Sequence, residues 1–230
     1  MDIVIVALDR CLGSALLGLS DILTTANQVI AMAGEIERPF RVIIASQDGR
    51  PVVDGFGRHL ETDAALSEIP NCTAAIIPGF APDEAARPPS MAGYSAVANW
   101  LRRQHGHGAL VGASCSGVFL LAEAGLLNNR RCTTTWWLHD LFEERYPKAN
   151  VRRGGALCFD DRVITAGGPV SWIDVALHMI GVLAGQDAAR ASADFTIVDT
   201  IPSAQAAYIP TGFASSGDTL IAQAERLIRH

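Results

Sequence analysis

The chain has 230 residues, of which 49% are hydrophobic and 18% are charged. This balance excludes intrinsic disorder and predicts one folded domain with a sizeable core. The formal net charge is -6, so the chain gains nothing from counterion release and is not expected to bind nucleic acid by itself. Five scattered cysteines without a Cys-x-x-Cys pair predict neither a disulfide framework nor a metal site, and no cofactor is expected.

The N-terminus begins directly with an apolar run, Ile3 to Val6, and lacks the basic segment and cleavage site of a signal peptide. No uninterrupted apolar run approaches the ~20 residues that are needed to span a bilayer. The sequence therefore predicts a cytoplasmic protein without a membrane partner.

Apolar and amphipathic stretches alternate along the chain. Continuous apolar runs predict buried strands at residues 3–8, 40–45, 74–77 and 109–113. Helical spacing predicts helices at 15–32, 92–103, 117–124, 136–146 and 171–183, with Ser14 and Ser171 as N-caps of the first and the last. Residues 52–60 and 151–164 have hairpin patterns, the second turning at Asp160-Asp161. This alternation is typical of a doubly wound, mostly parallel sheet.

The end of the chain has a different pattern. Residues 200–217 contain prolines and glycines and little periodicity, which is typical of a connecting arm after a main domain at 1–199. The spacing of apolar residues at 218–230 then predicts a new amphipathic helix. A helix this short is marginal without a packing partner. It either docks on the main domain or is the first helix of a further domain, and the preceding arm favours the second.

A cysteine at the end of a predicted strand is the strongest candidate for chemistry. The segment from Val111 to Gly117, Val-Gly-Ala-Ser-Cys-Ser-Gly, passes from a strand through small residues into a helix. This is the layout of a nucleophile elbow, although Ala113 stands where the strict motif has glycine. The helix N-terminus is expected to lower the pKa of Cys115 and to offer N–H groups to an anion. The alternative is an inert buried cysteine.

A second turn, Pro78-Gly79-Phe80, also follows a predicted strand. Gly79 is either an oxyanion-hole donor above Cys115 or part of a plain turn, and the sequence favours neither. Trp136 and Trp137 are adjacent on a predicted helix and therefore point in different directions. One is expected in the core and the other at a pocket or interface.

A cysteine hydrolase also needs a base and an orienting acid. The first histidine after the elbow helix is His139, which is expected to face solvent. The other candidates are expected to have structural or solvated roles: His105 and His107 in a loop with no third metal ligand, His59 and His178 as isolated residues, and Glu123 and Asp174 on helix surfaces or caps.

Several of these segments resemble a known family. They are residues 112–127 (GASCSGVFLLAEAGLL), 132–138 (CTTTWWL), 145–147 (RYP), 163–168 (VITAGG) and 174–178 (DVALH). They are similar to the class I glutamine-amidotransferase-like superfamily, also called ThiJ/PfpI, and within it to the N-terminal sensor domain of AraC-type transcription regulators. The resemblance implies a flavodoxin-like three-layer α/β sandwich with a mostly parallel central sheet. Ligands of such sheets bind at the carboxyl ends of the strands.

The end of the chain carries the same resemblance. Residues 203–208 (SAQAAY) are similar to the arm of these regulators, and residues 217–220 (GDTL) to the entry of the first helix of their DNA-binding module. The resemblance implies that two helix-turn-helix units follow His230 in the full-length regulator and that DNA is bound only there. It also implies a homodimer, because such regulators read paired half-sites.

Two positions depart from the enzymes of the superfamily. These enzymes carry a histidine where this chain has Thr135, and an acid in the first helix where the matching residue is Ala15. A threonine hydroxyl cannot act as a base near neutral pH. The resemblance therefore favours a non-catalytic domain for small-molecule sensing and dimerisation, with an amine or amino-acid derivative as effector.

The alternatives are a cysteine-dependent hydrolase or hydratase, of the isonitrile-hydratase or glyoxalase-like kind, and a redox sensor that uses Cys115. In each case Cys115 has the nucleophile position. The expected ligand-binding residues are Gly79, Phe80, Ser114, Cys115, Ser116, Thr135 and Trp136.

Overall fold

A computed structural model describes residues 1–34, 39–82, 88, 90–202, 204–205 and 208–209. Within them a seven-stranded sheet has the strand order β10-β11-β7-β6-β1-β2-β5. Six strands are parallel: β1 (Asp2–Val6), β2 (Arg41–Ser46), β5 (Ala64–Ala65), β6 (Ala74–Ile77), β7 (Leu110–Ser114) and β11 (Val163–Ala166). The edge strand β10 (Leu157–Asp160) pairs antiparallel with β11. The predicted mostly parallel sheet is confirmed.

Two small ladders flank this sheet. Strands β3 (Val52–Val53) and β4 (His59–Leu60) form the predicted hairpin. The second predicted hairpin is shorter than expected and consists of β10 and β11, which turn at Asp161 and Arg162, both with positive φ. The residues before it form β9 (Asn150–Val151), which pairs in parallel with β8 (Arg131–Cys132).

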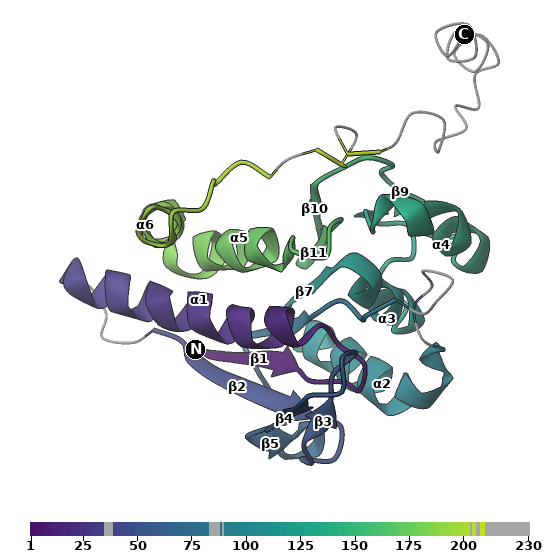
Figure 1. Ribbon diagram of the computed structural model, residues 1–230, viewed down its shortest axis with the longest axis horizontal. Helices are drawn as coiled ribbons and strands as arrows, with labels where there is room; N and C mark the ends of the chain where they lie inside the picture. The colour runs from purple at the N-terminus through teal and green to yellow at the C-terminus, as the bar shows by residue number, and fades with distance from the viewer. Residues whose placement is uncertain (35–38, 83–87, 89, 203, 206–207, 210–230) are drawn as a thin grey trace, which may run out of the picture.

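Helices cover both faces of the sheet (Figure 1). One face carries α1 (Gly13–Met32), α5 (Trp172–Ala184) and α6 (Gln186–Thr196), and the other carries α2 (Ser95–Gly106) and α3 (Val118–Glu123). Side chains of β1 alternate between the two cores: Ile3 and Ile5 pack with α1, whereas Val4 and Val6 pack with α2. The fold is thus the expected flavodoxin-like three-layer sandwich.

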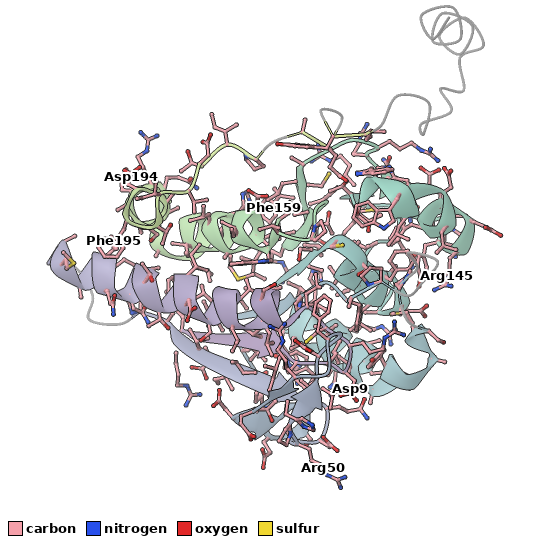
Figure 2. The ribbon with its side chains drawn as sticks, in the orientation of Figure 1. Asp9, Arg50, Arg145, Phe159, Asp194 and Phe195 are labelled. Atoms are coloured by element: carbon pink, nitrogen blue, oxygen red, sulfur yellow. The ribbon has the colours of Figure 1, made fainter. Side chains whose placement is uncertain are left out.

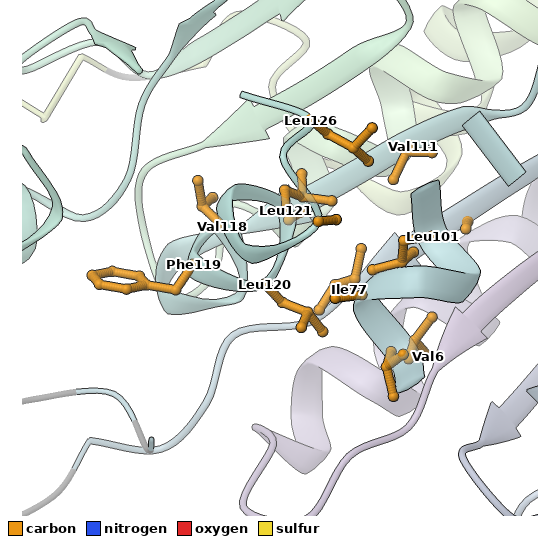
Figure 3. Packing of buried hydrophobic residues seen from close by; sticks show 14 of the residues in the cluster. Val6, Ile77, Leu101, Val111, Val118, Phe119, Leu120, Leu121 and Leu126 are labelled. Carbon is orange, nitrogen blue, oxygen red and sulfur yellow. The ribbon is translucent and has the colours of Figure 1, made fainter. Parts of the chain in front are cut away.

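Short helices complete the second layer. The 3-10 turns η1 (Leu66–Glu68), η2 (Met91–Tyr94), η3 (Cys115–Gly117) and η4 (Trp136–Leu138) precede or connect the longer elements, and α4 (His139–Arg145) follows η4. Helix α3 is buried along its first five residues, and Figure 3 shows its side chains packed against Ile77, Leu101 and Val111 of the neighbouring elements. Since β7, η3 and α3 are continuous, this packing fixes the position of Cys115.

The predicted N-cap residue is wrong for α1, whereas Ser171 has the predicted N-cap position of α5 without making a side-chain cap. The N-cap residue of α1 is Leu12 and has no side-chain cap. Ser171 does precede α5, but its hydroxyl accepts a hydrogen bond from the N–H of Gly168 at 3.1 Å and caps no N–H of the helix. Helix α6 was not predicted, because its alanine-rich sequence has few large apolar residues.

Helix α1 is longer and more apolar than expected from the prediction that no segment approaches membrane-spanning length. Its 20 residues are long and apolar enough to cross a membrane by length and composition. In the structure its apolar face packs against β1, α5 and α6, with nine buried residues that include Leu16, Leu19 and Leu23. The apolar content of α1 is therefore accounted for by its position in the core.

Candidate functional site

Cys115 is the first residue of η3, directly after the end of β7, and has a φ of 53°. This left-handed backbone conformation is uncommon for a residue with a side chain. The turn brings the chain against the end of β6: a Cβ on Gly117 would lie 2.5 Å from the carbonyl oxygen of Pro78. The small residues of the segment are thus required by the close approach of two backbones.

The Cys115 thiol is buried and protonated at neutral pH. Only 3% of the residue is exposed, and burial raises the pKa of its thiol to about 11. The backbone N–H and hydroxyl of Ser116 and the hydroxyl of Thr135 oppose this shift without cancelling it. The expectation that the helix N-terminus lowers the pKa is therefore wrong, since α3 has only six residues and the desolvation of the sulfur outweighs its effect.

The turn at Gly79 and Phe80 lies directly against the cysteine. A Cβ on Gly79 would lie 3.0 Å from the Cβ of Cys115. The Ser116 hydroxyl accepts a hydrogen bond from the Phe80 N–H at 2.9 Å and donates one to the Phe80 carbonyl oxygen at 3.2 Å. Ser116 therefore ties the two turns together, and the N–H of Phe80 already has a partner.

A cavity of about 220 Å³ opens above Cys115 and Ser116. Three of the predicted ligand-binding residues line it: Phe80, Cys115 and Ser116. Gly79 and Ser114 are not among its lining residues. Trp137, which was expected either in the core or at a pocket, also lines it. Sequence reasoning missed other residues that complete it, among them Leu12, Pro82 and Pro169. These residues lie far apart in the sequence and carry no motif.

The two remaining predicted residues, Thr135 and Trp136, line a second cavity of about 480 Å³ that shares Trp137 and Pro169 with the first. Both tryptophans are half-buried, and their rings meet edge to face with centroids 5.2 Å apart. Of the two, Trp137 also packs against the core around α3, as expected of one tryptophan, but both residues line a cavity.

None of the described residues that line the Cys115 cavity carries an imidazole or a carboxylate. Thr135 is fully buried and its hydroxyl forms no other hydrogen bond with the described residues. Ala15 is also fully buried on α1. His139, which was expected to face solvent, is buried with its Nε2 3.0 Å from the carbonyl oxygen of Thr134, and burial lowers its pKa.

The other titratable candidates lie away from Cys115. His105 belongs to α2, is buried and has its Nε2 2.8 Å from the Asp161 carbonyl oxygen, so the predicted solvated loop is wrong for it. His178 packs against Phe159 of β10, which Figure 2 shows beside α5. Three of the remaining four have surface positions: His59 and His107 are exposed, and the exposed Glu123 accepts a hydrogen bond from the Tyr146 hydroxyl. The fourth, Asp174, lies in the first turn of α5 and is half-buried. The described residues contain no group of three or more potential metal ligands.

Part of the predicted arm is described, and it contacts the segment around Thr135. The carboxamide of Gln205 is buried between Thr134, Gly155 and Trp136. It occupies the space beside Gly167, where a Cβ would lie 1.9 Å from its nitrogen. No sequence signal indicates this contact, because a glutamine in a predicted arm has no pattern that indicates burial. The predicted helix at 218–230 and the arm residues after 209 lie outside the described residues.

The chain is similar to transcription regulators and to an enzyme. It is 33% identical over 160 residues to the HTH-type transcriptional regulator CdhR of Pseudomonas aeruginosa, which covers 69% of this chain and 45% of that protein. The isonitrile hydratase of Pseudomonas putida is 28% identical over 174 residues, 73% of this chain and 68% of the enzyme. The chain thus spans about half the length of the regulator that it matches.

The fold is also found in solved structures. An AraC family transcriptional regulator from Pseudomonas putida superimposes with a TM-score of 0.71 at 19% identity, over 85% of this chain and 98% of that one. The family model for DJ-1/PfpI matches residues 23–181. This range contains the Cys115 turn, the Thr135 segment and the glycines after β11. The chain therefore belongs to the DJ-1/PfpI family.

Proposed function

We propose that this chain is the small-molecule-sensing domain of an AraC-type transcription regulator, and that the effector binds in the cavity beside Cys115. One observation carries the proposal: the described lining of this cavity has the family's cysteine but no general base. A thiol with a pKa of about 11 is almost entirely protonated at neutral pH and is a poor nucleophile. The cavity is therefore suited to binding without turnover.

The similarity to CdhR supports the regulatory half of the proposal. The relative is about twice as long as the matched region, which leaves room for a separate DNA-binding part. The net charge of -6 agrees with DNA contact elsewhere than on this domain. In this proposal the protein is a cytoplasmic homodimer, residues 200–217 are the arm and residues 218–230 begin the DNA-binding module. The arm transmits the state of the domain.

A second candidate function is a cysteine-dependent hydratase or hydrolase. The similarity to isonitrile hydratase favours it. The buried Thr135 and Ala15 weigh against it, since neither side chain accepts a proton near neutral pH. A redox sensor is less favoured still, because oxidation requires an accessible thiolate and Cys115 is only 3% exposed.

The test is a thermal-shift screen of the 230-residue chain against a metabolite library, in which each hit is re-analysed by NMR for chemical change. A sensor predicts a compound that raises the melting temperature with dose and is recovered unchanged. The enzyme predicts a compound that is consumed by the wild type and not by Cys115→Ala, and this result would overturn the proposal. Thr135→His is the complementary variant. Turnover gained on this change would show that the wild-type site lacks only a proton acceptor for catalysis.

A further inference from the structure

The second cavity lies between the domain body and the arm. One wall consists of Trp136 and Trp137 of η4, and another contains Gly168 and Asp174 with residues between them. The third consists of the described arm residues Val198, Asp199, Ile201, Gln205 and Tyr208. After leaving α6, the described part of the arm runs past α5 towards the end of the sheet that holds β10 (Figure 1). Since arm and body each supply a wall, a molecule in this cavity contacts both at once.

The lining of this cavity has a distinct chemistry. Two indole rings and the phenol of Tyr208 supply aromatic surface, and Ile173, Val198 and Ile201 supply aliphatic surface. The charged groups among its described lining residues are two carboxylates, Asp174 and Asp199, with no lysine, arginine or histidine. Aromatic faces and carboxylates both attract cations, whereas an anion here would meet repulsion.

Asp174 has an environment that a cation would improve. Burial raises the pKa of this carboxyl, against a smaller opposite effect from Ser171. No ion pair between Asp174 and a described residue offsets the desolvation of its charged form. A bound ammonium group would supply the missing partner. The exposed arm residues Ile201 (75%) and Tyr208 (67%) would at the same time cover the apolar part of the ligand.

We infer that this cavity binds a small organic cation with an apolar body, of the alkylammonium class, and that the bound cation holds the arm against the body through Gln205. The inference rests on the proposed sensor function only for the consequence of holding the arm. The cavity is a different one from that above Cys115, with which it shares Trp137 and Pro169. A cation is the expected ligand because the lining presents carboxylates and aromatic faces together.

Gln205 is the contact that makes the arm position specific. Its Oε1 accepts a hydrogen bond from the backbone N–H of Trp136 at 2.8 Å. Its Nε2 donates to the carbonyl oxygens of Thr134 at 2.9 Å and Gly155 at 2.7 Å. Trp136 lines the cavity, and its backbone N–H donates the hydrogen bond to Gln205 of the arm. A ligand that packs on this residue therefore stabilises the same geometry that Gln205 requires.

The first measurement is calorimetric titration of the 230-residue chain with hexylammonium and, separately, with hexan-1-ol. These probes share the apolar body and differ in charge. We expect hexylammonium to bind about tenfold or more tightly than the alcohol, and Asp174→Asn to abolish most of this difference. Asp199→Asn, on the exposed rim, tests the charge without disturbing a buried residue. Equal affinity of the two probes, or undetectable binding of both, overturns the inference.

The second measurement is hydrogen exchange at the backbone N–H of Trp136, which reports whether its hydrogen bond to Gln205 is formed. Hexylammonium is expected to slow this exchange at least fivefold in the wild type and in Gln28→Ala, a matched change of an exposed glutamine on α1. In Gln205→Ala the exchange is expected to be fast with or without ligand. Binding that leaves Trp136 exchange unchanged in the wild type overturns the role of the arm. Neither readout uses Cys115, so the two proposals fail independently.

Discussion

The Ser116 hydroxyl both accepts a hydrogen bond from the Phe80 N–H and donates one to the Phe80 carbonyl oxygen. One side chain thereby joins the turn after β6 to the turn after β7, and the two turns together form the floor of the Cys115 cavity. Ser114, two residues earlier, is equally buried but its hydroxyl has no partner among the described residues. The two serines of one motif thus have opposite energetic roles.

Ser116→Ala should destabilise the protein by about 1–3 kcal/mol, because it leaves a buried N–H without an acceptor. Ser114→Ala should leave the free energy of unfolding unchanged or raise it slightly, since it removes a buried hydroxyl that makes no hydrogen bond. Urea unfolding followed by circular dichroism measures both. Equal losses in the two variants would contradict this assignment.

Gly112→Ala should destabilise the protein by about 1–3 kcal/mol through overpacking. A Cβ on Gly112 in β7 would lie 2.6 Å from Cγ1 of Val175, so the strand and α5 would be forced apart. The matched control is Gly106→Ala at the end of α2, where no atom lies within 4 Å. In that position alanine should raise the free energy of unfolding by up to about 1 kcal/mol, because it restricts the unfolded chain and favours the helix. Thermal unfolding of both variants is sufficient, and a stable Gly112→Ala would show that β7 and α5 are less closely packed.

His139 should make the stability depend on pH below neutrality. Burial lowers the pKa of this imidazole, and the nearby carbonyl oxygen of Thr134 opposes the shift only in part. The unfolded chain therefore binds the proton first as pH falls through about 6.5. The stability contributed by the neutral imidazole is present above that pH and is lost as pH falls towards the lower native pKa.

The measurement is the free energy of unfolding of wild type and His139→Gln between pH 7.5 and 5. The curve of the variant should be flatter in this window. His107→Gln, which changes an exposed histidine, serves as control and should follow the wild type. Parallel curves for all three proteins would show that His139 is not buried in its neutral form.

Cys115 should react slowly with iodoacetamide in the native protein. With a pKa of about 11 its thiolate fraction at pH 8 is on the order of 0.1%, and the sulfur is buried as well. Labelling followed by peptide mass spectrometry should find Cys158, which is only half-buried, modified before Cys115. The Cys115 rate should rise about tenfold per pH unit up to pH 10. Faster labelling of Cys115 than of Cys158 at pH 7 would instead indicate an accessible thiolate.

The sequence by itself determined the layered fold and the position of the cysteine. The apolar run at 74–77 coincides with β6. The strand before Cys115 and the turn that ends at Gly117 are recognisable in the sequence because backbone geometry depends on local residues. The absence of a histidine at Thr135 was equally readable, since a residue type is a sequence property. These features depend on near neighbours in the chain.

Only the tertiary structure decided which side chains share a cavity and which titratable groups are buried. Histidines 105 and 139 are buried because other segments cover them, and no spacing within α2 or α4 indicates this. Gln205 reaches Thr134 across 71 positions of the chain, and the cavity beside it combines three segments that have no common motif. Burial and desolvation are set by the packing of distant segments, so they move the pKa of Cys115 upward where the local pattern of strand, turn and helix indicates the opposite.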